Sequence, residues 1–183
     1  MRFSPLDIPG LVLVDIEPHA DERGFFARSF CVHEFAAAGL PTCFPQENLS
    51  FNTREGTVRG MHYAAPPHAE GKLVRCTFGA IHDVVIDLRP HSPHYCRSVG
   101  ITLSRDRYAA LYIPPGFAHG FQTLSDRTEV LYHMETSHAP DAARGVRWND
   151  PVFSILWPMP VTVISARDSA WPDYVPVERE ILP

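Results

Sequence analysis

Short apolar runs, separated by turn-forming residues, extend along the whole chain. Eighteen prolines and eleven glycines are spread among these runs, and this punctuation is typical of an all-β sandwich or barrel. The pattern predicts strands over 10–16, 24–30, 45–51, 57–63, 72–78, 81–88, 98–103, 110–113, 118–124, 128–136 and 161–164. Many short strands with little helix predict a double-sheet jelly roll, the cupin type of all-β fold.

Helical periodicity is confined to one short segment. Residues 32–40, with the sequence VHEFAAAGL, predict a helix with Gly39 as its C-cap. A second short turn is expected after Asp150 and Pro151, and the HSPH run at 91–94 is expected to form a polar loop between strands. Helices therefore contribute little to the predicted core.

Alternation within two of the predicted strands places polar side chains on inward faces. Tyr132 is in phase with the apolar Val130 and Met134, and Lys72 is in phase with Val74. An inward lysine is costly unless a partner or a ligand satisfies its charge. Both positions are therefore candidates for a functional pocket, although a buried tyrosine is more often a core residue and a lysine more often a surface one.

His62 and Arg59 lie on one predicted strand in opposite phase. An irregular backbone is needed for both to reach the same pocket, and Gly60 between them can provide it. With Lys72 nearby, this segment brings a base and two cations together. Such a set suits a substrate that is anionic and that loses a proton from carbon.

Size and composition describe an ordinary globular protein. The chain has 183 residues, of which 45% are hydrophobic and 20% charged, so we expect one domain over 1–183 with a core of its own. The net charge of -5 argues against broad binding to nucleic acid or to an anionic membrane. A local basic pocket for a phosphate group remains compatible with it.

The cysteines predict a reducing compartment. Cys31, Cys43, Cys76 and Cys96 show no CxxC spacing and no disulfide framework. The sequence contains no signal-peptide pattern and no apolar run long enough to span a bilayer. We therefore expect a cytoplasmic protein.

Several segments, taken together and in order, resemble one known family. They are ADERGFFARSF at 20–30, QENLSFN, RGMHY, GKLVR, DVVIDLR, IPPGFAHGF at 113–121, WNDP and ISARDSAWP at 164–172. Each is ordinary alone, but their order and spacing resemble the dTDP-4-dehydrorhamnose 3,5-epimerase family of nucleotide-sugar epimerases over nearly the whole chain. The resemblance implies a cupin-type jelly roll that epimerises a nucleotide-linked 4-keto-6-deoxysugar at C3, and also at C5 unless activity is confined to one carbon.

The resemblance also implies a role for each residue of the candidate catalytic set. His62 matches the family's base, although most single histidines at strand ends are inert, and Asp168 matches the carboxylate that orients it. Tyr132 matches the acid that reprotonates carbon from the opposite face. Lys72 matches the lysine beside the C4 keto oxygen, where a cation stabilises an enolate. No cofactor is expected, because the ketone already acidifies both neighbouring carbons.

Further positions match the family's contacts with the diphosphate and sugar: Arg23, Gln46, Asn48, Arg59 and His119. Four positions depart from the family pattern. Arg28 and Ala143 stand where glutamate is usual, His138 replaces a tyrosine, and Arg167 replaces a lysine. Because Glu-to-Arg reverses a charge, we expect altered recognition of the nucleotide or the sugar. The family resemblance further implies a homodimer with exchanged N-terminal strands.

A metal site is not expected. Metal-binding cupins call for an HxH pair followed by a glutamate and a later histidine, whereas His62 is followed by Tyr63 and Ala64. Three other functions stay open: a nucleotide-sugar 3,4-ketoisomerase, a catalytically silent sugar-nucleotide binding protein, and a metal-dependent oxygenase. The ketoisomerase would not need Tyr132, the silent protein would not need the catalytic set, and the oxygenase would contain bound metal.

Overall fold

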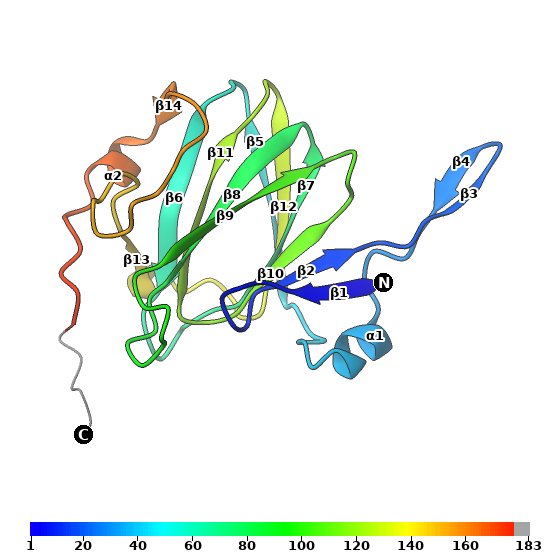
Figure 1. The fold of residues 1–183 in the computed structure, drawn as a ribbon, viewed down its shortest axis with the longest axis horizontal. Helices are drawn as coiled ribbons and strands as arrows, with labels where there is room; N and C mark the ends of the chain where they lie inside the picture. The colour runs from blue at the N-terminus through cyan, green and yellow to red at the C-terminus, as the bar shows by residue number, and fades with distance from the viewer. Residues whose placement is uncertain (178–183) are drawn as a thin grey trace.

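The computed structural model describes residues 1–177, and nearly all of its regular structure is β-strand (Figure 1). One six-stranded sheet has the order β1-β2-β10-β7-β12-β5, formed by Arg2–Pro5, Val12–Asp15, Ala110–Ile113, Lys72–Phe78, Thr128–Met134 and Gln46–Asn52. The second has the order β13-β6-β11-β8-β9, formed by Ala143–Gly145, Thr57–Ala64, Phe117–Thr123, Ala80–Asp87 and Ser98–Ser104, and β14 (Val163–Ile164) pairs with β6. The predicted double-sheet architecture is confirmed.

The main core lies between the two sheets. It includes Val74 of β7 and Val130 of β12 from the first sheet, and Val85 of β8 and Phe121 of β11 from the second. Tyr132 packs against this cluster, so its predicted inward direction is correct. Burial of an aliphatic side chain contributes about 1.5–3 kcal/mol, and this shared core therefore holds the two sheets together.

Each sheet is also covered on its outer face. Helix α1 (Val32–Ala37) buries Phe35 in a cluster with Leu73 and Tyr112 of the first sheet. The carboxyl-terminal segment buries Phe153 in a cluster with Met61 and other residues of the second sheet. Because strands covered on both faces lose the simple alternation of apolar and polar positions, β8 reads as a nearly continuous apolar run.

The helix is shorter than the predicted range 32–40. It ends at Ala37, and Gly39 follows with φ of +71°. The N–H groups of Gly39 and Leu40 donate to the carbonyls of Ala36 and Phe35, at 3.0 and 2.9 Å. This pairing satisfies the last carbonyls of the helix, as in a Schellman motif, so the predicted capping role of Gly39 is confirmed.

The amino-terminal strands were predicted least well. The range 24–30 forms only β4 (Gly24–Phe26), paired with β3 (His19–Asp21), which the pattern did not predict. This hairpin projects from the body of the molecule (Figure 1), and Phe25 and Phe26 are 45% and 76% exposed. The ring of Phe25 packs on that of Tyr108, with centroids 4.9 Å apart, but within residues 1–177 neither phenylalanine joins a core cluster, so little burial supports a longer strand.

An irregularity in β6 occurs at Gly60, as the opposite phases of Arg59 and His62 predicted. The register of β6 against β11 shifts between the pairs His119–His62 and Phe121–Arg59. Gly60 has φ of +131°, and a Cβ there would collide with the backbone of Gly120. Glycine is therefore required by both conformation and space.

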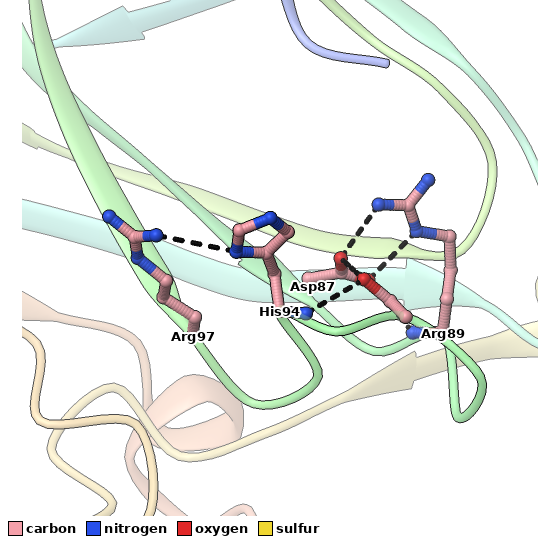
Figure 2. Close-up of polar contacts among 5 residues, drawn as sticks. Asp87, Arg89, His94 and Arg97 are labelled. Carbon is pink, nitrogen blue, oxygen red and sulfur yellow. Dashed lines mark hydrogen bonds and ion pairs between the residues drawn. The ribbon is translucent and has the colours of Figure 1, made fainter. Parts of the chain in front are cut away.

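A buried carboxylate fixes the polar loop between β8 and β9 (Figure 2). Asp87 is fully buried and accepts hydrogen bonds from Nε and Nη2 of Arg89, at 2.8 and 2.7 Å, and from Oγ of Ser92 at 2.6 Å. Farther along the loop, a guanidinium nitrogen of Arg97 lies 3.3 Å from Nδ1 of His94. The HSPH run is thus a loop held by polar contacts, as predicted.

Asp87→Ala is expected to lower the free energy of unfolding by about 2–3 kcal/mol, because it leaves Ser92 and the partly buried Arg89 without their acceptor. Hydrogen bonds from these two residues lower the pKa of Asp87, although burial alone would raise it. Its stabilising effect is therefore present above the ordinary value of 3.8 and is lost as the pH falls through the lower folded-state pKa. Urea unfolding at several pH values tests this.

The exposed Asp106 provides the matched control, and Asp106→Ala should change stability by less than about 0.5 kcal/mol. Equal stability of Asp87→Ala and wild type at neutral pH would contradict the structural role of Asp87.

Candidate active site

Two adjoining cavities are lined by residues from both sheets. His62 of β6, Lys72 of β7 and Tyr132 of β12 line both of them. The first cavity, of about 360 Å³, is also lined by Gln46, Asn48, Glu70, His138, Ala143, Arg144 and Arg167. The second, of about 300 Å³, adds Ser50, Arg59, His119 and Phe121. Together they provide space for a ligand larger than a single sugar.

His62 forms a close pair with Asp168. Nε2 of His62 lies 2.7 Å from Oδ1 of Asp168, and the other carboxylate oxygen accepts a hydrogen bond of 3.2 Å from the N–H of Gly60. Burial by itself raises the pKa of Asp168, but the hydrogen bonds from His62, Gly60 and Ser165 outweigh burial and lower it. An ionised Asp168 can fix the ring of His62 and stabilise the imidazolium form.

A short helix brings Asp168 to this position from far along the chain. Helix α2 (Ala166–Ser169) begins after Ser165, whose Oγ accepts a hydrogen bond of 3.0 Å from the N–H of Asp168. Trp171, just beyond the helix, lies against Gly145 of β13, where any Cβ would collide with its ring. The helix is thus seated beside β6, as Figure 1 shows.

Lys72 and Tyr132 lie on neighbouring strands of the other sheet. Lys72 is opposite Met134 in the register of β7 and β12, and Tyr132 is opposite Val74. Burial raises the pKa of Tyr132, with a lowering contribution from Arg59 and a raising one from Glu70. Tyr132 is therefore protonated at neutral pH and can donate a proton. Because His62 belongs to the opposite sheet, base and acid approach the cavities from different sides.

The ammonium of Lys72 has a carboxylate partner that the sequence analysis did not identify. Nζ of Lys72 lies 3.1 Å from Oε1 of Glu70, and the two side chains are 11% and 16% exposed. The sequence signal was available, because residues two apart in an extended segment point to the same side. An inward lysine thus predicts a role for an acidic residue at position 70.

A second histidine of the second cavity, His119, is also paired with a carboxylate. Nε2 of His119 lies 2.7 Å from Oδ1 of Asp83, and both side chains are buried. Asp83 was also missed by the sequence analysis, although it is a carboxylate within the apolar run of β8. His119 stands directly opposite His62 in the register of β11 and β6, so the two histidines belong to one surface.

Arg59 adds a cation to the second cavity. Its Nε donates to Oδ1 of Asn52 at 2.6 Å, and Nη2 donates to the carbonyl of Phe51 at 3.4 Å. These bonds turn the guanidinium toward the wall formed by β5. Arginine in this setting suits an anionic oxygen, such as that of a phosphate group.

A chain of amide hydrogen bonds fixes one wall of the first cavity. The N–H of His138 donates to Oε1 of Gln46 at 2.8 Å, and Nε2 of Gln46 donates to Oδ1 of Asn48 at 3.0 Å. Both acceptor oxygens are used within this chain. Asn48 therefore has its N–H groups available, which suits an acceptor on a ligand.

Three of the four departures from the family pattern lie at the first cavity. His138, Ala143 and Arg167 line it, together with Arg144. The guanidinium of Arg167 lies over the ring of Trp171, 5.4 Å from its centroid. This wall therefore carries positive charge from Arg144 and Arg167. At position 143 it has open space, where the glutamate usual in the family would place a carboxylate.

Two predicted binding residues lie outside both cavities of this chain. Arg23 pairs with Asp21 in the projecting hairpin, with Nη2 2.6 Å from Oδ2, and its side chain is 84% exposed. Arg28 pairs with Glu34, with Nη1 2.6 Å from Oε1. In Figure 1 the hairpin lies at the opposite end of the molecule from α2, which carries Asp168. Within one chain, these arginines and Asp168 do not meet.

Within residues 1–177, no group of three or more His, Cys, Asp or Glu side chains is arranged to hold a metal ion. In the same residues, no helix is long and apolar enough to cross a membrane. Among the polar groups that line the cavities are a histidine, a tyrosine and the cations of lysine and arginine side chains. Such a set can remove a proton beside a carbonyl group and stabilise the oxyanion that forms.

Comparison with known proteins gives a match over most of the chain. The model of the family described as dTDP-4-dehydrorhamnose 3,5-epimerase matches residues 5–175. A dTDP-4-dehydrorhamnose 3,5-epimerase from Shigella flexneri is 40% identical over 169 residues, covering 92% of this chain and 93% of the relative. A dTDP-4-dehydrorhamnose 3-epimerase from Streptomyces niveus is 38% identical, covering 92% of this chain and 81% of the relative.

Solved structures agree in fold. The dTDP-4-dehydrorhamnose 3,5-epimerase of Bacillus anthracis, with TDP and PPi bound, has a TM-score of 0.92 and 35% identity, covering 94% of this chain and 99% of that one. The RmlC epimerase of Legionella pneumophila, in complex with dTDP-4-keto-L-rhamnose, has a TM-score of 0.87 and 32% identity. That match covers 93% of this chain and 90% of the other.

Proposed function

This chain belongs to the dTDP-4-dehydrorhamnose 3,5-epimerase family, and we propose that it epimerises dTDP-4-keto-6-deoxyglucose to dTDP-4-keto-rhamnose. One arrangement carries the proposal: His62 on one sheet and Lys72 with Tyr132 on the other line the same cavities, and Asp168 of α2 pairs with His62. Inversion at carbon needs a proton acceptor on one face of the sugar and a donor on the other.

His62 is the base that removes the C3 proton. The 2.7 Å contact with Asp168 orients the ring and stabilises the imidazolium that forms on proton transfer. A positioned general base contributes roughly a hundred- to ten-thousand-fold to the rate. The electron pair of the C3–H bond forms a double bond between C3 and C4 of the sugar. The electrons of the C4 carbonyl bond move to the C4 oxygen, which gives an enolate.

Lys72 stabilises this enolate. Its buried ammonium lies where the two cavities meet, and a cation aimed at a developing oxyanion acts strongly when water is excluded. The keto group is restored when carbon takes up a proton. The same charge serves a second enolate on the C5 side, because C3 and C5 flank one carbonyl.

Tyr132 delivers the proton from the face opposite His62. Burial raises the pKa of its hydroxyl, which keeps the proton available at neutral pH until the enolate accepts it. Reprotonation by His62 would restore the original configuration, whereas reprotonation by Tyr132 inverts it. Proton donation by Tyr132 is therefore the step that turns proton exchange at C3 into inversion of configuration.

The remaining polar groups suit the nucleotide diphosphate. Arg59 and His119 offer donors in the second cavity, and Asn48 and Arg167 offer them in the first. Arginine pairs well with phosphate oxygens. We assign these residues, with Gln46 holding Asn48, to binding of the diphosphate and the sugar.

The number of carbons inverted is a separate question, because the two relatives described above are named as a 3,5-epimerase and as a 3-epimerase at nearly equal identity. Borohydride reduction after enzyme treatment, followed by analysis of the released 6-deoxyhexoses, tests both the activity and its extent. Inversion at C3 and C5 gives L-rhamnose and 6-deoxy-L-talose. Inversion at C3 alone gives 6-deoxy-D-allose and 6-deoxy-D-gulose, and recovery of quinovose and fucose alone would contradict the proposal.

A homodimer with exchanged amino-terminal strands would complete the site. The projecting β3–β4 hairpin carries exposed Phe25 and Phe26, and Arg23 and Arg28 of the same segment lie away from the cavities of their own chain. Exchange between two copies would bury the aromatic rings and bring each arginine to the partner's cavity. This arrangement supports the assignment of Arg23 and Arg28 to substrate binding in the dimer.

A cytoplasmic location is part of the proposal. It is supported by the four cysteines, which are free thiols in the structure. Burial raises the pKa of Cys76 to about 11, so this thiol is an unreactive part of the core.

We expect weaker selection for thymidine nucleotides than in relatives that carry glutamate at 28 and tyrosine at 138. Arginine at 28 donates where a carboxylate accepts, and histidine at 138 offers less stacking area. A lost hydrogen bond to a buried polar group costs about 1–3 kcal/mol, which shifts preference roughly ten- to a hundred-fold. Calorimetric titration with dTDP, UDP, CDP and GDP should show another nucleoside diphosphate binding as well as dTDP or better. A clear preference for dTDP, unchanged in Arg28→Glu, would contradict this prediction.

A further inference from the structure

Glu70 and Lys72 form an ion pair inside the first cavity. Oε1 of Glu70 and Nζ of Lys72 are 3.1 Å apart, with side chains 16% and 11% exposed, and both residues line the cavity that His62 and Tyr132 also line. A carboxylate so close to the candidate acid, base and cation lies within the reaction site. Removing an ion pair from water costs desolvation free energy. The presence of this pair inside the cavity therefore indicates a functional role.

The backbone between the two residues is held by its neighbours. The carbonyl of Gly71 accepts a hydrogen bond of 3.0 Å from the N–H of Glu135, and the carboxylate of Glu135 packs so closely on Gly71 that any Cβ there would collide with it. Tyr112 holds that carboxylate from behind, donating from its hydroxyl at 2.7 Å. The backbone on which Glu70 is mounted is therefore fixed from the neighbouring strands β10 and β12.

Lys72 needs a partner to keep one position. A lysine side chain has four rotatable bonds, and Lys72 lines both cavities, so its ammonium could turn into either one. The ion pair with Glu70 restricts the ammonium of Lys72, which carries three N–H donors and can still donate to a ligand. The pair thus points the cation to the place where the cavities meet.

We infer that Glu70 is a positioning residue for catalysis, which holds the Lys72 ammonium where the C4 oxygen of the substrate becomes an enolate oxygen. This inference rests on the proposed function. Glu70 also acts on Tyr132: with burial as the larger cause, its negative charge contributes to the raised pKa of that hydroxyl. The larger electrostatic contribution to that pKa comes from Arg59 and lowers it, so the role inferred for Glu70 rests on its contact with Lys72.

Three substitutions distinguish the effect of the length of the Glu70 side chain from the effect of its negative charge. Glu70→Gln keeps an acceptor of the same length, Glu70→Asp keeps the charge but withdraws it by one bond, about 1.5 Å, and Glu70→Ala removes both. Since loss of a donor to an oxyanion costs about a hundred- to a thousand-fold, a misplaced donor should cost part of that. We expect kcat to fall about ten- to a hundred-fold in Glu70→Ala and about ten-fold in Glu70→Asp, with KM changed less than about three-fold. Glu70→Gln should stay within about five-fold of wild type.

The same substitutions in a Lys72→Met background show whether Glu70 acts through Lys72. If it does, Glu70→Ala should lower the residual exchange rate by less than about two-fold there, since coupled residues are not additive. Glu129→Ala is the matched control, because the Glu129 carboxylate accepts a hydrogen bond of 2.7 Å from Thr77 and lines neither cavity. If Glu70→Ala fails to fold, the contrast between Glu70→Asp and Glu70→Gln decides.

Three results would overturn the inference while leaving the proposed function in place: wild-type kcat in Glu70→Ala or Glu70→Asp, an equal loss in the Lys72→Met background, or a loss in Glu70→Gln as large as that in Glu70→Ala. A wild-type enzyme that does not epimerise any nucleotide 4-ketosugar would overturn the proposed function and this inference together.

Discussion

His62→Ala is expected to abolish solvent exchange at C3 of the nucleotide 4-ketosugar. His62, paired with Asp168, is the one histidine in residues 1–177 that lines both cavities. Its removal leaves His119, which lines only the second cavity, as the other histidine of that sheet at the cavities. General base loss lowers rates roughly a hundred- to ten-thousand-fold, and the rate of deuterium uptake at C3, followed by NMR in D2O, measures the effect.

His133→Ala is the matched control for this variant. His133 also pairs with a carboxylate, with Nε2 2.7 Å from Oε2 of Glu47, but it lines neither cavity, so the variant should exchange at the wild-type rate. Exchange at the wild-type rate in His62→Ala would remove His62 from the mechanism. In that case, His119 with Asp83 would become the candidate base.

Tyr132→Phe is expected to separate exchange from inversion. The enolate still forms through His62 and Lys72, and His62 can return a proton to the face from which it came. Inversion should fall by about a hundred-fold or more, while deuterium uptake with retention stays within about ten-fold of the wild-type rate. NMR of the unreacted epimer measures retained exchange, and the sugar analysis described above measures inversion.

Tyr174→Phe provides the comparison, because the Tyr174 hydroxyl lies 2.8 Å from that of Tyr95, outside both cavities. Equal loss of exchange and inversion in Tyr132→Phe would assign Tyr132 to substrate positioning instead of proton donation. Full inversion in the variant would show that a group other than Tyr132 donates the proton on the opposite face.

Local sequence rules predicted the sheet that carries Lys72 and Tyr132. Period-two alternation placed both residues on an inward face, and the structure buries Lys72 and packs Tyr132 against the core. The same rules placed a backbone irregularity at Gly60. These predictions succeeded because each depends on neighbours within one strand, where the direction of a side chain follows from the pleat.

Long-range pairings lay beyond such rules. Asp168 is 106 residues from His62 and sits on a four-residue helix that has no periodicity to detect, so only the family resemblance suggested their contact. Glu70 was missed because it precedes the predicted strand 72–78 and carboxylates outside strands are usually solvated, whereas its ion pair with Lys72 is seen only in three dimensions. The hairpin with Arg23 was predicted poorly, because its Phe25 and Phe26 are 45% and 76% exposed and do not pack in the core of this chain.

The most direct test of the account is an NMR time course of wild-type enzyme in D2O with dTDP-4-keto-6-deoxyglucose and its UDP, CDP and GDP counterparts. The account predicts that deuterium replaces the proton at C3, and at C5 in a 3,5-epimerase, with inverted product accumulating and C2 unlabelled. Migration of the carbonyl group to C3 would identify a ketoisomerase. Absence of deuterium at both C3 and C5 with all four substrates would contradict the central claim that this site removes a proton beside a ketone.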